Sequence, residues 1–332
     1  MMSPTTTLPV SWSNWVTENL SLGVPRSEIA GVLRDNGFDL RAVDQLAAAS
    51  LASRSGTDRR SPELPKGKAQ DLMTVYSQLW RTRGAAHCDR VANLSPSDFF
   101  RWYYSLNNPV VLLDGAVGWA AVAHWTPDYL ASRWGRERVE VMWRRNEDPQ
   151  YELNSERHKT RMPLRDFVDL VRTAGETNDF YMVANNHSLD QGNMRALLNE
   201  LNFPDGILDR ANAEKRIFLW FGPAGTITPL HHDTCNVLFA QIYGRKLVTL
   251  IPSWETHLMY NSIGVYSEVD CEHPDFENYP LFRETSRMQV LLEPGQMLFI
   301  PVGWWHHVRS LDISISVSFT NFKASNDYTW TS

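Results

Sequence analysis

The segment from Ile313 to Phe319 alternates apolar and hydroxyl side chains, and this pattern restricts the fold more than any other feature of the sequence. In an extended strand the apolar side chains lie on one face and the serines on the other, namely Ser314, Ser316 and Ser318. On an outer strand the serine face would meet water. In a barrel with a polar interior it would line a ligand cavity.

Other short apolar segments surround this strand in the C-terminal third. They lie at residues 216–220, 236–243, 246–251, 288–292 and 297–300, and turns separate them. Closely spaced short strands are typical of a β-sandwich or a β-barrel. We therefore expect a mainly β core after about residue 215.

The chain ahead of this core has a different texture. Residues 95–175 alternate helical and strand-like segments, with strands predicted at 109–113 and 139–142 and a helix at 163–173. This pattern predicts a mixed layer of helices and strands that flanks the β core.

The N-terminal part predicts a smaller unit. Residues 1–66 contain short apolar periods, and the stretch 53–68 is rich in Gly, Ser, Arg and Pro. We expect an N-terminal helical segment and linker over residues 1–70, followed by one large domain over 71–332.

The charge balance excludes some partners. The chain has 32 Lys and Arg against 38 Asp and Glu, a formal charge of −6, so it lacks the basic excess that binds nucleic acids or anionic membranes. No apolar run approaches the roughly 18 residues that span a bilayer, and the first residues lack the pattern of a signal peptide. The sequence thus favours the cytoplasm.

Two distant motifs supply metal-ligand chemistry. His231 and Asp233 are two residues apart, so both side chains leave the same face if the segment is extended. His306 follows a Trp-Trp pair much later in the chain, where the sheet can return beside the first motif. Two imidazoles and one carboxylate are the set that non-haem Fe(II) oxygenases use, although zinc also accepts these ligands.

Each motif alone is weak evidence. His87 and Asp89 have the same spacing in a polar stretch without a strand pattern, so the tripeptide arises by chance. Adjacent histidines also compete for the ligand positions. In a regular strand His232 points away from His231, and His307 is the second choice to His306.

A lysine begins the return strand of a hairpin next to the first motif. Gly244 supplies the turn, and Lys246 starts the strand that follows. This side chain would either face solvent or point into the cavity and hold a carboxylate. The turn at residues 293–296 delivers another strand towards the Trp-Trp-His motif.

Together, three segments resemble the JmjC (cupin-like) 2-oxoglutarate oxygenases, and among them the factor-inhibiting-HIF type of protein hydroxylase. They are Thr-Pro-Leu-His-His-Asp at 228–233, Gln-Ile-Tyr-Gly-Arg-Lys at 241–246, and Glu-Pro-Gly at 293–295 through Trp-Trp-His at 304–306. The likeness is clear over about residues 216–322 and looser from Ser95. It implies flanking helices around a double-stranded β-helix core, with the catalytic barrel at about 216–322.

The resemblance also assigns roles to single residues. It implies that His231, Asp233 and His306 bind Fe(II), with no further catalytic residue beyond these ligands. It implies that Lys246 pairs with the distal carboxylate of 2-oxoglutarate, helped by the hydroxyl groups of Thr228 and Tyr181.

The sequence departs from this family in three places. The asparagine that the family commonly has six residues after its first ligand falls on Val237, so Asn236 would take or lose that contact. A second family asparagine falls on Ser318, which keeps a hydroxyl. The Arg-Gln pair that holds the substrate in the asparaginyl hydroxylases is replaced by Val265 and Tyr266.

We therefore predict an Fe(II)-, O2- and 2-oxoglutarate-dependent dioxygenase. It would hydroxylate a C–H bond of a peptide or protein side chain and release succinate and CO2. A small natural product or amino acid is the alternative substrate. A non-catalytic cupin-like binding module is the alternative of another class, and a metal-dependent isomerase or dioxygenase of the wider cupin group would need neither Lys246 nor the Thr228 hydroxyl.

Overall fold

The computed structural model describes residues 8, 12–13, 16, 26–35, 38, 66–82, 87–184, 186–190, 192–262 and 264–328. The chain divides into two compact units, Met1–Leu72 and Met73–Ser332. In the first unit, helix α2 (Arg26–Asp35) buries Ile29 and Leu33 against Val16.

Most of the predicted N-terminal segment and linker lies outside the described residues. The last part of the predicted linker is helical, because α4 spans Lys66–Arg81. Its apolar residues recur at helical spacing. Among the described helices, none is long and apolar enough to cross a membrane.

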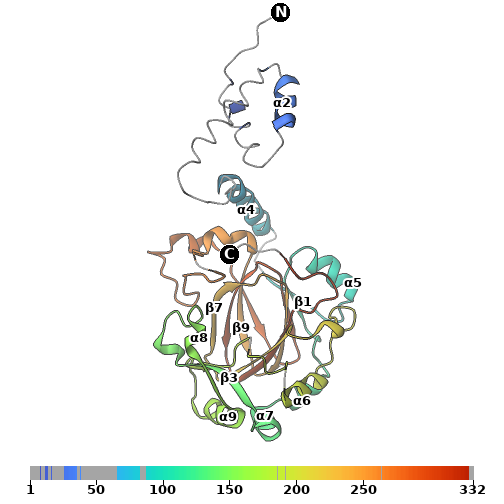
Figure 1. Cartoon of the computed structure of the whole chain (residues 1–332), viewed down its shortest axis with the longest axis vertical. Coiled ribbons are helices and arrows are strands. Elements are labelled where there is room, and N and C mark those ends of the chain that lie inside the picture. The colour runs from blue at the N-terminus through green and yellow to red at the C-terminus, as the bar shows by residue number, and fades with distance from the viewer. Residues whose placement is uncertain are drawn as a thin grey trace, which may run out of the picture. The chain divides into compact units, whose positions relative to one another are not determined.

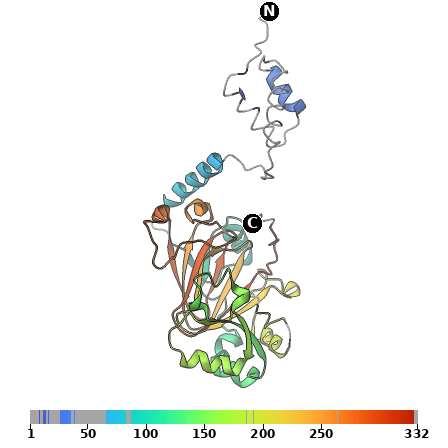
Figure 2. The same cartoon turned by 60° about the vertical axis from the view of Figure 1, so that its left-hand side comes forward.

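Two facing sheets form the centre of the larger unit (Figures 1 and 2). In spatial order, the first sheet contains β1 (Asp89–Val91), β2 (Val110–Leu112), β11 (Met297–Ile300), β8 (Val237–Tyr243), β13 (Ser314–Phe319) and β6 (Ile217–Gly222). The second contains β10 (Met288–Leu292), β9 (Lys246–Ile251), β12 (Trp305–Ser310) and β7 (Ile227–His232). All of these pairs are antiparallel except β1 with β2.

Helices and a small third sheet flank these strands. The third sheet orders β4 (Lys159–Pro163), β3 (Arg138–Trp143) and β5 (Phe180–Tyr181). The α-helices are α5 (Pro96–Asp98), α6 (Ala120–His124), α7 (Pro127–Trp134), α8 (Ser155–His158) and α9 (Leu164–Thr173), and α7 packs against α9 (Figure 1).

Further helical segments, of the 3-10 type except for the π-helix η1, connect these elements. They are η1 (Phe99–Tyr104), η2 (Arg145–Glu147), η3 (Asn193–Glu200), η4 (Arg210–Asn212), η5 (Ser253–Leu258) and η6 (Pro280–Glu284). The prediction of a mainly β fold with flanking helices and a double-stranded β-helix core is confirmed.

The alternating strand lies in the middle of the larger sheet as β13. Its apolar residues Ile315, Val317 and Phe319 pack outwards into the core that the helices cover. Its serines face the interior between the two sheets, where all three are buried. Of the two alternatives left open by the sequence, the barrel with a polar interior is therefore correct.

The predicted hairpin is wrong, because β8 and β9 belong to different sheets and pair with other strands. The turn that carries the chain from one sheet to the other depends on a glycine. Gly244 has φ +68°, and a Cβ at this position would collide with the backbone carbonyl of Ile313. Gly118 has a similar φ of +81° but open space around the position of a Cβ. A comparison of substitutions at the two positions therefore distinguishes the cost of backbone strain from the cost of a steric collision.

We expect Gly118→Ala to lower the free energy of unfolding by about 1 kcal/mol, the cost of a left-handed conformation at a non-glycine residue. Gly244→Ala adds a backbone collision and should cost clearly more. The two midpoints of urea unfolding measure this difference. Equal losses would show that β13 yields freely at the turn.

Candidate metal centre

The pairing of β7 with β12 brings the two predicted histidine ligands together. His306 is the cross-strand partner of His231. Asp233 directly follows β7, and its backbone carbonyl accepts a hydrogen bond of 3.0 Å from the N–H of Gly303, which precedes β12. The loops at this end of the two strands are therefore tied together.

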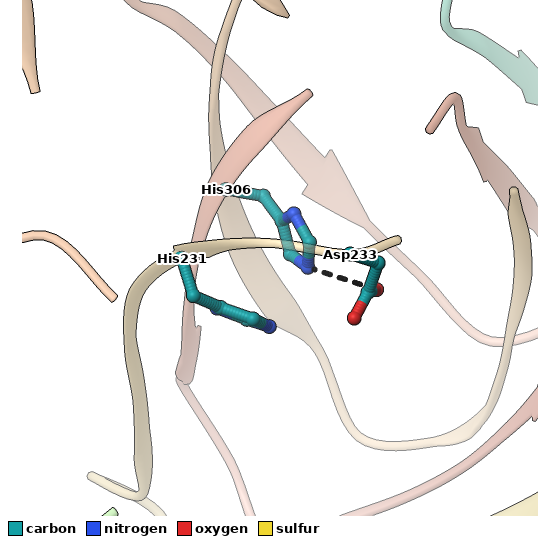
Figure 3. Close-up of side chains that lie close together, drawn as sticks. All are labelled: His231, Asp233 and His306. Carbon is teal, nitrogen blue, oxygen red and sulfur yellow. Dashed lines mark ion pairs between the residues drawn. The ribbon is translucent and has the colours of Figure 1, made fainter. Parts of the chain in front are cut away.

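The three side chains converge on one point in the barrel (Figure 3). One donor atom from each of His231, Asp233 and His306 lies within 4.8 Å of the other two. The Nε2 of His306 is 3.6 Å from Oδ2 of Asp233, and the two imidazole centroids are 4.0 Å apart. These separations suit ligands that share one ion.

Backbone carbonyls orient both imidazoles. Nδ1 of His231 lies 2.8 Å from the carbonyl oxygen of Pro229, and Nδ1 of His306 lies 3.0 Å from that of Trp304. Since a carbonyl can only accept, Nδ1 carries the proton in each ring and Nε2 is left to bind a metal. Burial, with a smaller effect from His231, lowers the pKa of His306 to about 3, which keeps this imidazole neutral.

The donor set fits a divalent transition metal. Two neutral imidazoles and one carboxylate on one side leave the remaining coordination positions open, and Fe(II) oxygenases use this arrangement. Zinc accepts the same donors but supplies no redox chemistry. The residues present therefore fit the iron that the sequence predicts.

The neighbouring histidines lie elsewhere. The ring of His232 packs edge-on against Trp305, with centroids 4.8 Å apart. His307 is buried, its Nε2 lies 4.0 Å from Glu272, and burial lowers its pKa to about 4. The structure thus brings His231 and His306 to the shared point and excludes both alternatives from it.

Lys246 is a buried amine that forms no ion pair with the described residues. Its side chain is 1% exposed, and its Nζ donates a hydrogen bond of 2.7 Å to the hydroxyl of Tyr181. The same Nζ lies 5.1 Å from the ring centroid of Phe239 and 5.9 Å from that of Trp220. Within the described part of the chain, no carboxylate lies within 4 Å of it. Burial lowers the pKa of Lys246 to about 7.

The predicted hydroxyl groups face the same interior. Thr228 is the cross-strand partner of Val308, whose side chain belongs to the core between the sheets. Ser318 is the partner of Phe239, and its Oγ accepts a hydrogen bond of 2.9 Å from the indole Nε1 of Trp220. Both residues therefore lie on the face between the two sheets.

Asn236 has a different set of contacts. Its amide nitrogen donates to Asn326 Oδ1 at 2.9 Å and to the Tyr328 hydroxyl at 3.0 Å. Its Oδ1 accepts from the backbone N–H of Val302 at 2.8 Å. The side chain thus ties the C-terminal segment to the loop before β12. Its predicted contact with 2-oxoglutarate stays a prediction.

Sequence reasoning missed two aromatic residues beside Lys246. Trp220 and Phe239 belong to segments that were predicted as strands, and the alternation within β6 indicates which residues share a face. Ile217, Leu219 and Phe221 pack outwards, so Trp220 must point inwards. This signal was available, but the segment was interpreted only as a strand.

A pocket of about 380 Å³ lies beside His231, although none of the three predicted ligands lines it. Tyr266 is part of its wall and stacks on His231, with ring centroids 5.6 Å apart. The other lining residues are Pro149, Gln150, Tyr151, Glu152, Leu153, Pro229, Ser262, Ser267, Glu268 and Tyr279. The wall is therefore rich in tyrosine, contains two carboxylates and has no basic residue.

Comparisons with known proteins match this architecture. The family described as a cupin-like domain matches residues 96–328. The "Lysine-specific demethylase JMJ30" of Arabidopsis thaliana is 34% identical over 242 residues, which cover 70% of this chain and 54% of that protein. The "Lysine-specific demethylase 8" of Xenopus tropicalis is 33% identical over 229 residues, or 67% of this chain and 50% of that protein.

A third relative is more distant. The "Jumonji C domain-containing protein 5" of Drosophila melanogaster is 28% identical over 253 residues, covering 72% of this chain and 61% of that protein. The chain thus spans about half the length of the first two relatives. These names support the JmjC type, whereas the closer likeness to factor-inhibiting-HIF hydroxylases stays a prediction.

His306→Gln and His307→Gln form a matched pair on one strand. We expect His306→Gln to weaken binding of Co(II), used as a probe, by more than about 100-fold, because it removes a ligand rather than an outer partner. His307→Gln should leave the affinity within a factor of about three, since this ring lies outside the site. Titration calorimetry measures both. A reversed order would reject the assigned ligand set.

Proposed function

This chain belongs to the family of cupin-like domains, in its JmjC form, and from that premise we propose that it oxidises a side chain of a peptide or protein. JmjC domains of this kind are 2-oxoglutarate-dependent dioxygenases that use Fe(II), 2-oxoglutarate and O2. One observation carries the proposal for this chain: three converging metal donors share a barrel with a buried lysine that forms no ion pair with any residue the structure describes.

Different residues of the chain would bind the metal and the cosubstrate. His231, Asp233 and His306 would hold the metal by three ligands and leave room for other groups. When bound, Fe(II) supplies the oxidising chemistry, with succinate and CO2 as the coproducts of 2-oxoglutarate. Lys246 and the Tyr181 hydroxyl would bind the distal carboxylate of that cosubstrate.

The surroundings of Lys246 support this role. The aromatic rings of Trp220 and Phe239 exclude water from the ammonium group, and a carboxylate that enters this site is bound in a medium of low dielectric constant. The lysine thus provides both charge and orientation, while the barrel wall shields the reacting end from bulk water.

The pocket next to His231 favours a cationic side chain as the substrate. Tyrosine rings and carboxylates attract ammonium and guanidinium groups. The wall contains three tyrosines and Glu268 but no basic residue, whereas Glu152 is already paired with the buried Arg145. The names of the relatives point the same way, since two of them are called lysine-specific demethylases. We therefore propose lysine, methylated lysine or arginine in a peptide as the substrate class.

Hydroxylation and demethylation share their first step. Hydroxylation of an N-methyl C–H bond gives a carbinolamine, which releases formaldehyde and leaves the amine without that methyl group. Hydroxylation of a carbon in the aliphatic part of the lysine or arginine side chain gives a stable product that keeps the oxygen. The nature of the C–H bond presented to the metal decides between the two outcomes.

Peptides that differ at a single position test the substrate class. We expect succinate release, and a change in peptide mass, with lysine, methylated lysine or arginine at that position but not with norleucine. Mass spectrometry distinguishes the gain of one oxygen from the loss of a methyl group. Asp233→Ala should abolish both signals.

A carboxylate in the pocket provides a further control. Glu268→Gln should raise the KM for the cationic peptide about threefold, the loss of one exposed charge contact, while Glu277→Gln leaves it unchanged because Glu277 does not line the pocket. If the metal-loaded protein binds 2-oxoglutarate but oxidises neither peptides nor small amines, the domain is a binding module instead.

The pKa of Lys246 predicts how cosubstrate affinity depends on pH. In the protein without cosubstrate, Lys246 has a pKa of about 7. A bound carboxylate raises this pKa, so above pH 7 the binding of 2-oxoglutarate is accompanied by the uptake of a proton. Affinity for 2-oxoglutarate should therefore be constant below about pH 7 and fall as the pH rises above it. Calorimetry in buffers of different ionisation heat, without O2, measures the proton uptake.

Two variants make this prediction specific. Lys246→Arg keeps its charge throughout this range, so its affinity should not vary with pH in this way. Lys246→Met should bind weakly and take up no proton. Proton uptake that persists in Lys246→Met would assign it to another group.

A further inference from the structure

The strand that carries His231 is at the edge of its sheet. β7 pairs with β12 alone within the four-stranded sheet. That pairing is interrupted, because three steps along β7 from Thr228 to His231 correspond to two steps along β12 from Val308 to His306. β7 therefore contains an extra residue between its cosubstrate threonine and its metal ligand.

Backbone contacts cover one half of the free edge of β7. The N–H of His232 donates to the carbonyl of Val265 at 3.0 Å, and the carbonyl of Leu230 accepts from the N–H of Ser267 at 2.9 Å. This short pairing ends at the bulge, where Pro229 has no N–H to donate. The other half of the strand needs different partners.

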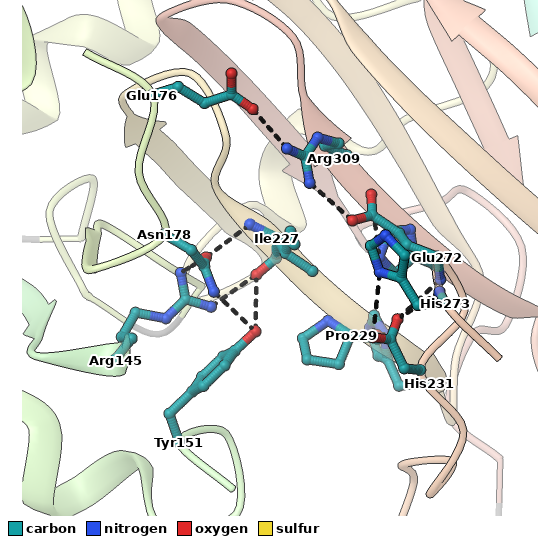
Figure 4. Close-up of polar contacts among 12 residues, drawn as sticks. Arg145, Tyr151, Glu176, Asn178, Ile227, Pro229, His231, Glu272, His273 and Arg309 are labelled. Carbon is teal, nitrogen blue, oxygen red and sulfur yellow. Dashed lines mark hydrogen bonds and ion pairs between the residues drawn. The ribbon is translucent and has the colours of Figure 1, made fainter. Parts of the chain in front are cut away.

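At Ile227, side chains take the place of a neighbouring strand (Figure 4). The N–H of Ile227 donates to Oδ1 of Asn178 at 2.8 Å, and its carbonyl accepts from Nη2 of Arg145 at 2.7 Å. Nη1 of Arg145 also donates to Oδ1 of Asn178 at 2.9 Å. Both backbone groups of one residue are therefore held by a pair of side chains that are bonded to each other.

A tyrosine and a carboxylate complete this arrangement. The hydroxyl of Tyr151 accepts from Nδ2 of Asn178 at 3.3 Å and lies 3.5 Å from the Ile227 carbonyl. Glu152 pairs with Nη2 of Arg145 at 2.9 Å, and the guanidinium lies 4.2 Å from the centroid of the Tyr151 ring. The Arg145 side chain is fully buried, and its Nε has no hydrogen-bond partner.

This orphaned Nε indicates what determines the orientation of the guanidinium. A buried charge is costly unless its hydrogen bonds are satisfied, and here one of them is given up. The two terminal nitrogens, in contrast, donate three hydrogen bonds, to Asn178, Glu152 and Ile227. The guanidinium is thus placed for its contacts with β7 and the pocket rather than for its own solvation.

We propose that Arg145 and Asn178 are positioning residues that fix the first half of β7, so that Thr228 faces Lys246 and His231 faces the metal. Ile227 immediately precedes Thr228, and Asn178 lies three residues before Tyr181, which contacts Lys246. This pair of side chains therefore lies next to both the strand that contains Thr228 and the segment that contains Tyr181. The role in cosubstrate binding rests on the function proposed above.

Two substitutions at one position separate this role from general packing. Asn178→Asp keeps an oxygen that accepts from the Ile227 N–H and from Arg145, whereas Asn178→Leu fills a similar volume without it. Asn321→Leu is the control, because Asn321 is buried, more deeply than the half-buried Asn178, and bonds a backbone carbonyl, that of Asp209, outside the metal centre.

The first readout needs neither metal nor cosubstrate. In the metal-free protein, amide hydrogen exchange at Ile227 and Thr228 should accelerate about tenfold in Asn178→Leu, as expected for the loss of one partly buried hydrogen bond. It should stay near wild type in Asn178→Asp and in Asn321→Leu. Unchanged exchange in Asn178→Leu would overturn the proposal.

The second readout concerns the site itself. Asn178→Leu should raise the Kd for 2-oxoglutarate about tenfold in the Co(II)-loaded protein and change the visible Co(II) spectrum that the cosubstrate induces, with Asn178→Asp restoring both. An equal rise of the Kd in Asn321→Leu would show that the effect comes from a less stable fold, and it would overturn the proposal. If the wild type binds no 2-oxoglutarate, the proposed function fails, and exchange at Ile227 still decides whether the pair holds the strand.

Discussion

The register of β7 against β12 is the constraint on which the rest of the structure depends. Because His231 and His306 are opposite each other, two residues that are far apart in sequence present their imidazoles to the same point. A slip by one residue would turn His231 to the outer face and bring His232 inwards. The hydrogen bond between Gly303 and Asp233 fixes the ends of the two strands, so the carboxylate stays within reach of both rings.

This register is useful only because the barrel tolerates polar groups in its interior. Ser316 donates to Oε1 of the buried Gln241 at 2.7 Å, and Nε2 of Gln241 donates to the carbonyls of Tyr243 and Gly244 at 2.8 Å. The serine face of β13 thus supports the turn from which Lys246 enters the cavity. Satisfied hydrogen bonds remove most of the cost of burying these groups. Lys246 is the exception, and its lowered pKa records the cost of its desolvation.

Local patterns in the sequence were sufficient to predict a β fold and to select the three residues that the structure brings together at the metal centre. Alternation along residues 313–319 requires a sheet with two different faces, and two histidine motifs with a lysine between them restrict the chemistry that can lie inside it. The partners of Asn236 were not predictable in this way, since Asn326 and Tyr328 are 90 and 92 residues away and no local periodicity connects them. Arg145 and Asn178 were missed for the same reason. Their purpose depends on which edge of β7 is left free, and only the assembled sheets determine that.

An edge position for the metal strand has a clear advantage in spite of its weaker pairing. A central strand would be covered on both sides, whereas the free edge of β7 lets Pro229 and Tyr266 form part of the pocket beside His231. An unsatisfied edge would, however, expose backbone groups and invite pairing with another chain. Side chains that bond the backbone at Ile227 resolve this conflict, because they satisfy the edge without extending the sheet across the pocket. The pocket beside His231 and the support of its ligand strand therefore follow from the same arrangement.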